Sequence, residues 1–313
     1  MPKVPVKARE LAADKRADSF DEVVAGYSES QALSEAGRCL QCKNPVCISG
    51  CPVSIDIKKF IYQITQKDYA SAYFTIRETN NFPSICGRVC PAEYQCRKAC
   101  VLNKGKLAYS SPEAINIHFL ERFAGDYGMR NNLETPRHRG MPGALLSATA
   151  PQIKGVLGAL PSATIKVAVV GSGPAGLCCA GELAGKGIKV IIFEGLQSCG
   201  GVLRYGIPSF RLPREVLDYE INYLVKLGVE LRNNVIIGKT IFLDELFQQG
   251  FSKIFLGLGA GVPAFLGIKG ENLCNVYSAN EFLTRVNLMS AYKFPEYHTP
   301  VNSGKHILVI GGG

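Results

Sequence analysis

Most of the cysteine residues gather in the first third of the sequence, where their spacing points to iron–sulfur chemistry. Eight of the 12 Cys residues lie between Cys39 and Cys100. The first run is Cys39, Cys42, Cys47 and Cys51, followed by Pro52, and the second is Cys86, Cys90, Cys96 and Cys100, with Pro91 after Cys90. Ferredoxins use closely spaced Cys residues with one Cys before a proline, and that Cys reaches over to the other of two clusters. Two such runs predict two 4Fe-4S clusters.

Zinc and disulfide bonds are the alternatives for so many thiols. Structural zinc sites favour paired CxxC units, and the sequence holds only one, at Cys39 and Cys42. The first 20 residues are charged and lack the apolar core of a signal peptide, so we expect a cytoplasmic protein whose thiols stay reduced. Iron–sulfur clusters are therefore favoured over zinc and disulfides.

A glycine-rich turn in the second half predicts a dinucleotide site. The turn GSGPAG lies within a strand–helix–strand unit at 165–194 and follows an apolar strand. Its glycines let a pyrophosphate approach the helix N-terminus, whose amides and dipole favour negative charge. Glu194 ends the second strand, 23 residues after Gly171, where an acidic side chain binds ribose hydroxyls. The turn residues expected to contact the cofactor are Gly171, Gly173, Pro174, Ala175 and Gly176.

Three blocks of sequence position these residues. Residues 1–125 are Cys-rich and helical in pattern. Residues 126–163 are rich in Gly, Pro, Asn, Ser and Arg, which is typical of a linker. Residues 164–313 alternate strands and helices. The predicted fold is an α-helical double 4Fe-4S domain followed by an α/β Rossmann-like domain.

Apolar periodicity and turn residues predict individual elements within these blocks. A capping box at Ser28 and Gln31 begins a helix that leads to Cys39. Further helices are expected near 57–65, 69–78, 113–123 and 214–227. Beyond the strand–helix–strand unit, strands are expected within 228–234, 253–260 and 305–313.

The two cysteine runs resemble a known family. The segments RCLQCKNPVCISGCPVSIDI and ICGRVCPAEYQCRKAC are similar to the N-terminal double-cluster domain of the glutamate synthase small (beta) subunit-like family of FAD/iron–sulfur NAD(P)H oxidoreductases. Dihydropyrimidine dehydrogenase shares this domain. In the family, the ligands of the two clusters interleave. The resemblance implies one cluster on Cys39, Cys42, Cys47 and Cys100 and another on Cys51, Cys90 and Cys96.

The resemblance also implies that the eighth ligand is not a cysteine. The family leaves the position of Cys86 unligated and takes its last ligand from a helix further on, where AINIHFLERF places Glu121. Relatives carry Glu or Gln at that position. Two alternatives are open: Cys86 binds the cluster after all, or Glu121 is an ordinary solvated helix residue.

The glycine turn alone does not distinguish FAD from NAD, but the resemblance does. The turn and the later segment CGGVLRYGIPSFRLP are similar to the FAD half of the same family, which implies that Gly200, Gly201, Val202 and Arg211 bind the flavin. Without the family, Arg211 would be taken for a surface residue. The segment GLGAGVP matches the strand that returns to the cofactor, where small residues such as Gly259 let the backbone pass closely.

The resemblance implies an electron-transfer subunit of an NAD(P)H-dependent oxidoreductase. In the family a hydride passes between NAD(P)H and FAD, and two 4Fe-4S clusters carry single electrons to or from a larger catalytic redox subunit. KHILVIGGG at 305–313 matches the start of the family's NAD(P)H domain, so we expect the flavin domain to be C-terminally incomplete and NAD(P)H to bind only with the missing part. The alternative is a non-enzymatic electron-transfer or docking subunit of a larger redox complex, such as a hydrogenase or a formate dehydrogenase. No side chain is predicted to be catalytic.

Composition excludes several other classes of protein. The chain has 313 residues, 47% of them hydrophobic, which is enough material for one or two globular cores. No apolar run reaches the length of about 18 residues that a membrane-spanning helix needs. The formal net charge of +9 is spread along the chain without a long basic run, so nucleic acid is not expected as a partner.

Overall fold

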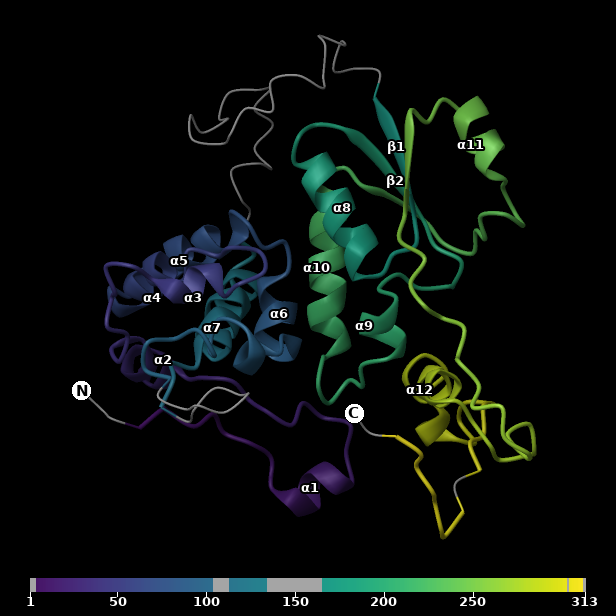
Figure 1. Cartoon of the computed structure of the whole chain (residues 1–313), viewed down its shortest axis with the longest axis horizontal. Helices are drawn as coiled ribbons and strands as arrows, with labels where there is room; N and C mark the ends of the chain where they lie inside the picture. Colours follow the sequence, from purple (N-terminus) through teal and green to yellow (C-terminus); the bar gives the residue numbers. More distant parts are fainter. Residues whose placement is uncertain (1–3, 104–112, 134–164, 303, 312–313) are drawn as a thin grey trace.

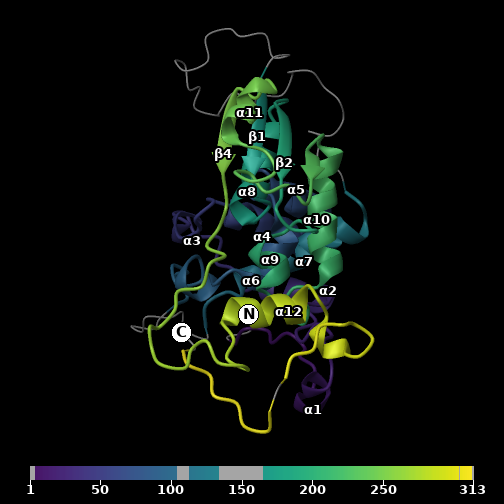
Figure 2. The ribbon, with the colours of Figure 1, turned by 90° about the vertical axis from the view of Figure 1, so that its right-hand side faces the viewer.

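The computed structural model describes residues 4–103, 113–133, 165–302 and 304–311, which form a helical unit and an α/β unit lying side by side (Figures 1 and 2). The helical unit contains α1 Ala13–Ala17, α2 Glu29–Ala36, α3 Val46–Ser49, α4 Ile57–Thr65, α5 Tyr69–Arg77, α6 Pro83–Val89, the 3-10 helix η1 Ala92–Tyr94 and α7 Ile117–Arg130. The α/β unit contains β1 Lys166–Val170, α8 Pro174–Ala184, β2 Lys189–Phe193, α9 Val202–Tyr205, α10 Arg214–Lys226, β3 Glu230–Arg232, α11 Leu243–Gln248, β4 Lys253–Leu256, α12 Ala279–Asn287 and the 3-10 helix η4 Ala291–Lys293. Among these described helices, none has the length and apolar character needed to cross a membrane.

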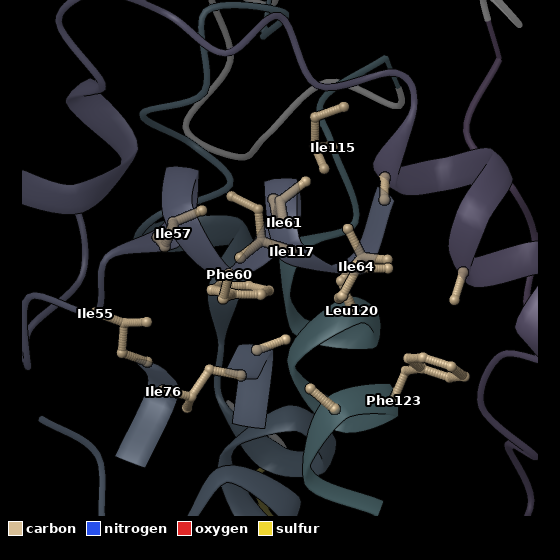
Figure 3. Packing of buried hydrophobic residues seen from close by; sticks show 14 of the residues in the cluster. Ile55, Ile57, Phe60, Ile61, Ile64, Ile76, Ile115, Ile117, Leu120 and Phe123 are labelled. Atoms are coloured by element: carbon tan, nitrogen blue, oxygen red, sulfur yellow. The ribbon is translucent and has the colours of Figure 1, made fainter. Parts of the chain in front are cut away.

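Helix α4 provides the centre of the core of the helical unit. The apolar residues of one face recur at helical spacing and are buried: Ile57, Phe60, Ile61 and Ile64. In Figure 3 this face meets Leu120 and Phe123 of α7 and Ile76 of α5. Four thiols pack against the edge of the same core, those of Cys39, Cys47, Cys51 and Cys100. The core thus supports the segments that carry the cysteine runs.

The helices predicted near 57–65 and 69–78 are confirmed as α4 and α5, and the capping box at Ser28 and Gln31 is confirmed at the start of α2. Helix α7 differs from its prediction, since it begins at Ile117 and continues to Arg130, past the boundary predicted at residue 125. The sequence pattern treats its glycines as linker residues, but they are packing positions. A Cβ atom on Gly128 would lie 2.4 Å from the Tyr73 ring, so only glycine allows α7 this approach to α5. The rest of the predicted linker, from residue 134, lies outside the described residues.

The α/β unit is built on a parallel sheet with strand order β3-β2-β1-β4. This order arises when each strand is joined to the next by a right-handed crossover, and it matches the first four strands of a doubly wound sheet. Helices α8 and α10 cover one face of the sheet, where Val169 and Ile192 point. Helix α11 covers the other face through Leu246, which packs against Ile191 and Phe193. The strands β1 and β2 are therefore buried on both faces, and the predicted strand–helix–strand unit is confirmed.

The strand predicted within 305–313 is wrong for the residues that the structure describes there. Residues 304–311 form no strand, and the side chains of Ile307, Leu308, Val309 and Ile310 are 68–84% exposed. A strand needs a neighbour to satisfy its backbone N–H and C=O groups, and the described part of the chain offers none beside this segment. The last two glycines of the predicted second dinucleotide turn, at 312 and 313, lie outside the described residues.

The two units share a hydrophobic core. Phe82 and Ile85, at the start of α6, are buried against Leu177 of α8 and Leu217 and Leu224 of α10. Helix α6 leads directly to the second cysteine run. The segment that carries possible cluster ligands is thus packed against the helix that follows the glycine turn.

A buried ion pair crosses the same interface. Arg77 of α5 and Glu220 of α10 are joined by a hydrogen-bonded salt bridge, and both side chains are shielded from solvent. The Arg77 guanidinium also lies over the Tyr223 ring, 4.0 Å from its centroid. The second Glu220 oxygen accepts a hydrogen bond from the backbone N of Ser84 at 3.3 Å. Both charges are therefore compensated by partners from the opposite unit.

Candidate iron–sulfur and dinucleotide sites

The first thiol group consists of four cysteines that line one cavity: Cys39, Cys42, Cys47 and Cys100. Three come from the first run and Cys100 comes from the second. The rest of the lining is mostly apolar and includes Ile57, Ile61, Ile115 and Ile117. Apolar walls of this kind keep water from a metal site and lower the local dielectric.

Burial and mutual repulsion act on these thiols. Burial, followed by the neighbouring thiols of Cys100 and Cys39, raises the pKa of Cys47 to about 11. Burial likewise raises the pKa of Cys39, although a hydrogen bond from the backbone of Gln41 acts in the opposite direction. Gln41 adopts a left-handed conformation, with φ 50°, that turns the chain between Cys39 and Cys42. Grouped thiols that resist ionisation as free side chains are what a cationic metal site would stabilise as thiolates.

The second thiol group contains Cys51, Cys90, Cys96 and the carboxyl group of Glu121. Burial, followed by the negative charges of Glu121 and Cys51, raises the pKa of Cys90 to about 12. Burial also raises the pKa of Cys96, and Glu121, Cys90 and Cys51 add to it. Glu121 itself is 6% exposed, and its burial raises its pKa to about 8. The structure thus brings together one cysteine of the first run, two of the second and a helix carboxyl group.

The two cysteine runs cross at Gly50, next to Cys51. A Cβ atom at position 50 would lie 2.7 Å from the Cβ of Ala99 and 3.2 Å from the carbonyl oxygen of Gln95. Glycine therefore allows the first run to lie directly against the second. The spacing of the cysteines along the sequence does not indicate this contact. The contact brings the two runs together, and each thiol group contains cysteines from both runs.

The donor set at both groups fits iron–sulfur clusters. Thiolates are the usual cluster ligands, and each of them binds a different iron atom, so they need not converge on one point. Within the described residues, no three His, Cys, Asp or Glu side chains converge closely enough to hold a single metal ion. Two buried polar atoms beside these groups, Arg97 Nε and His118 Nδ1, lack hydrogen-bond partners in the described part of the chain. Hydrogen bonds to cluster sulfur are one use for such atoms.

The glycine turn follows β1 and is held by backbone contacts. Gly171 has φ +95°, and a Cβ atom there would lie 2.4 Å from the carbonyl oxygen of Gly257. A Cβ atom on Gly176 would lie 1.9 Å from the carbonyl oxygen of Gly171. A Cβ atom on Gly173, in contrast, would meet nothing within 4 Å. Gly173 thus opens onto free space at the N-terminus of α8, where exposed amides attract an anion, and Pro174 and Ala175 are exposed beside it.

Glu194 lies at the end of β2, against this turn. Its carboxylate accepts hydrogen bonds from the backbone N of Ser172 at 2.9 Å and of Leu196 at 2.9 Å. The hydroxyl of Ser172 also bonds to it, and this hydroxyl accepts a hydrogen bond from the backbone N of Gly200 at 3.0 Å. Ser172 was not among the site residues predicted from the sequence. Its polar side chain is fully buried inside the glycine turn, a property that the structure shows and the sequence does not.

The other predicted flavin residues are distributed unevenly around the turn. Gly201 has φ +52°, and a Cβ atom there would lie 2.6 Å from the Cα of Gly173, so the Gly200–Gly201 doublet packs against the turn. Val202 is 58% exposed at the start of α9, and Gly259 follows β4 with φ +69°. Arg211 is exposed in the turn before α10. The geometry thus groups the doublet and Glu194 with the glycine turn and leaves Arg211 on the surface.

Comparison with known proteins defines the class of this chain. Residues 16–133 match the family described as dihydropyrimidine dehydrogenase domain II, 4Fe-4S cluster. Residues 165–313 match the family described as pyridine nucleotide-disulphide oxidoreductase. The chain is therefore an iron–sulfur domain joined to a nucleotide-binding oxidoreductase domain.

Curated relatives share this whole arrangement. The glutamate synthase (NADPH) small chain of Escherichia coli K12 is 32% identical over 315 residues, which cover 100% of this chain and 59% of the relative. The same protein of Azospirillum brasilense is 31% identical, covering 96% of this chain and 58% of the relative. The NAD-dependent dihydropyrimidine dehydrogenase subunit PreT of Salmonella typhimurium is 31% identical, covering 94% and 62%. The chain is similar to these relatives over nearly its whole length, and it spans about three fifths of the length of each of them.

Solved structures give a weaker likeness. FprA of Mycobacterium tuberculosis, in complex with NADPH, is 22% identical with a TM-score of 0.35, covering 39% of this chain and 28% of that chain. A likeness of this size has no bearing on function.

Proposed function

We propose that this chain is the FAD- and 4Fe-4S-containing electron-transfer part of an NAD(P)H-dependent oxidoreductase. It passes electrons between NAD(P)H and FAD on one side and a larger catalytic redox subunit on the other, through two 4Fe-4S clusters. The first thiol group holds one cluster, and the second thiol group, with Glu121, holds the other. FAD binds along the glycine turn, Glu194, Gly200, Gly201, Val202, Arg211 and Gly259.

The observation that carries this proposal is the core shared by the two units. Phe82 and Ile85 of the segment leading to Cys90 are packed against Leu177, which lies one residue beyond the last glycine of the turn. The second thiol group and the dinucleotide turn are therefore attached to the same packed core. Electron transfer between a flavin and a cluster requires that the protein hold the two in a fixed arrangement, which a shared core provides.

Each group of residues has a definable task in this function. FAD, when bound, accepts a hydride and releases single electrons. The apolar lining at Ile57, Ile61 and Ile115 keeps water from the first thiol group. The carboxylate of Glu121 offers a harder ligand than thiolate, and ligand type is one of the factors that set a cluster's potential. The names of the relatives, a small chain and a subunit, support a larger partner for this chain as well.

Replacing Gly173 by Ala tests the flavin site. Because an added Cβ atom at this position would meet nothing within 4 Å, we expect the free energy of unfolding to change by no more than about 1 kcal/mol. The added methyl group would occupy the space through which a pyrophosphate reaches α8, so FAD affinity should fall roughly tenfold or more, which is about 1.4 kcal/mol. Flavin fluorescence titration measures the affinity, and chemical denaturation measures the stability.

Two further variants serve as controls for Gly173→Ala. Gly304→Ala also adds a methyl group without a close contact, since its Cβ atom would lie 3.8 Å from the carbonyl oxygen of His306, and it should leave FAD affinity unchanged because it is away from the turn. Gly176→Ala should destabilise the fold itself, because its Cβ atom would overlap the carbonyl oxygen of Gly171. Unchanged FAD affinity in Gly173→Ala would contradict a pyrophosphate at this turn.

The proposed function is tested by photoreduction of bound FAD in the anaerobic, cofactor-loaded chain, followed by EPR spectroscopy. We expect electrons from the reduced flavin to reach the clusters and to appear as the paramagnetic signals of reduced 4Fe-4S centres. A flavin that stays reduced while the clusters remain EPR-silent would contradict electron transfer within this chain.

A further inference from the structure

Asn80 lies between the two side chains that compete for the eighth ligand position. It is 4% exposed, in the segment between α5 and α6. Its Nδ2 donates a hydrogen bond to Oε1 of Glu121 at 2.7 Å. Its Oδ1 accepts a hydrogen bond from the thiol of Cys86, with the sulfur 3.6 Å away. One buried amide therefore holds both candidates at once.

Both candidates lie beside the second thiol group. Cys86 is on α6 and Glu121 is on α7, and these helices touch at the adjacent positions, where a Cβ atom on Gly87 would lie 2.5 Å from the Cα of Arg122. Glu121 acts on Cys90 and Cys96 through its charge. The backbone N of Cys90 donates a hydrogen bond to the carbonyl oxygen of Cys86 at 2.9 Å. The fold thus brings a carboxylate and a spare thiol to the same side of this group.

The two hydrogen bonds of Asn80 have different consequences for metal binding by the two candidate ligands. The bond to Glu121 uses one carboxylate oxygen and leaves the other for a metal, as in a monodentate ligand. The bond from Cys86 uses the thiol proton, which a cysteine must lose before it can bind a metal. Asn80 therefore orients one side chain as a ligand and retains the other as a thiol.

We infer that Asn80 is a positioning residue that selects Glu121, rather than Cys86, as the eighth cluster ligand and makes Cys86 a reserve ligand. This inference rests on the proposed function, since it assumes a cluster at the second thiol group. When the Nδ2–H donor is removed, Cys86 replaces Glu121. In that exchange one Fe–O bond breaks and one Fe–S bond forms, the thiol proton leaves to solvent, and no electron is transferred.

The variant Asn80→Asp separates this role from a purely structural one. Oδ1 of Asn80 also accepts a hydrogen bond from the backbone N of Phe82 at 2.9 Å, which shapes the entry into α6. Asp keeps that acceptor but loses the amide donor and brings a second carboxyl group towards Glu121. Asn80→Ser is the second variant, because a Ser hydroxyl also bonds to the backbone two residues on but is too short to reach Glu121. Far-UV circular dichroism and retention of the first cluster check that both variants fold.

The test compares iron content, EPR spectrum and midpoint potential of the cofactor-loaded chain in five forms: wild type, Cys86→Ala, Asn80→Asp, Asn80→Ser and Asn80→Asp with Cys86→Ala. We expect Cys86→Ala to match the wild type, with about eight iron atoms. Asn80→Asp should keep about eight but show a changed spectrum and potential for one cluster, because its ligand has changed from oxygen to sulfur. The double variant should retain only about four.

Three results would overturn the inference. These are an unchanged spectrum in both Asn80→Asp and Asn80→Ser, a double variant that keeps about eight iron atoms, or a loss of iron in Cys86→Ala alone. A wild-type chain with only about four iron atoms would overturn the proposed function itself, and the inference with it. The wild-type iron content thus reports on the proposed function, and the variants report on Asn80.

Discussion

A chain with Cys47 replaced by Ala is expected to keep about four of its about eight iron atoms, because one cluster is lost and the other remains. The informative comparison is between two double variants. Cys47 and Cys100 belong to different runs but line the same cavity, so Cys47→Ala with Cys100→Ala should lose no more iron than the single variant. Cys47 and Cys51 belong to the same run but to different thiol groups, so Cys47→Ala with Cys51→Ala should lose nearly all of the iron. Iron and acid-labile sulfide analysis of anaerobically purified protein measures both.

The control for this series is Cys274→Ala, which changes an exposed thiol outside both groups. Its iron content should equal that of the wild type. If the double variant of Cys47 and Cys51 retained about four iron atoms, each run would be holding its own cluster. That outcome would contradict the grouping of cysteines across the two runs.

Replacing Arg77 by Met is expected to lower the free energy of unfolding by about 3–5 kcal/mol, because it leaves the carboxylate of Glu220 buried without its partner. Both side chains are shielded from solvent at the interface between the helical and α/β units. Glu220→Gln should be destabilising for the converse reason. The double variant Arg77→Met with Glu220→Leu removes both charges and should be more stable than Arg77→Met alone. Urea denaturation followed by circular dichroism measures these differences.

The exposed ion pair of Arg232 and Glu230 supplies the matched control. Arg232→Met should change the free energy of unfolding by no more than about 1 kcal/mol, since solvent screens that pair. A similarly small effect of Arg77→Met would mean that the interface does not depend on its buried ion pair. Apolar contacts alone would then hold the core shared by the two units.

Local signals in the sequence predict much of this fold. Helix α4 follows from apolar residues at helical spacing, and α2 follows from the capping box at Ser28 and Gln31. The strand–helix–strand unit follows from an apolar strand and the glycine turn. In each case the deciding residues are neighbours in the chain, so the pattern contains the relevant interactions.

Features that depend on distant residues could not be predicted in this way. The Arg77–Glu220 pair joins residues 143 positions apart, and neither side chain differs in sequence from an ordinary surface charge. Gly128 looks like a linker residue until Tyr73 is seen against it. The apolar segment Ile307–Ile310 resembles a strand, but strand formation depends on a neighbour that the described residues do not provide.

The candidate cluster ligands show the same division. The types and spacing of the cysteines predict iron–sulfur chemistry from local sequence. Their division into two groups came from the family resemblance, and the crossing of the runs at Gly50 gives it a physical basis. The contact of Asn80 with both Glu121 and Cys86 joins three separate segments and left no mark on the sequence pattern. The ligand assignments themselves stay predictions until iron is counted.

The most direct test of two clusters in this chain is its iron, sulfide and flavin stoichiometry, measured together with the visible spectrum of anaerobically purified protein. We expect a brown protein with about eight iron atoms and about eight sulfide ions per chain. A colourless protein that contains zinc, or no metal at all, would contradict it.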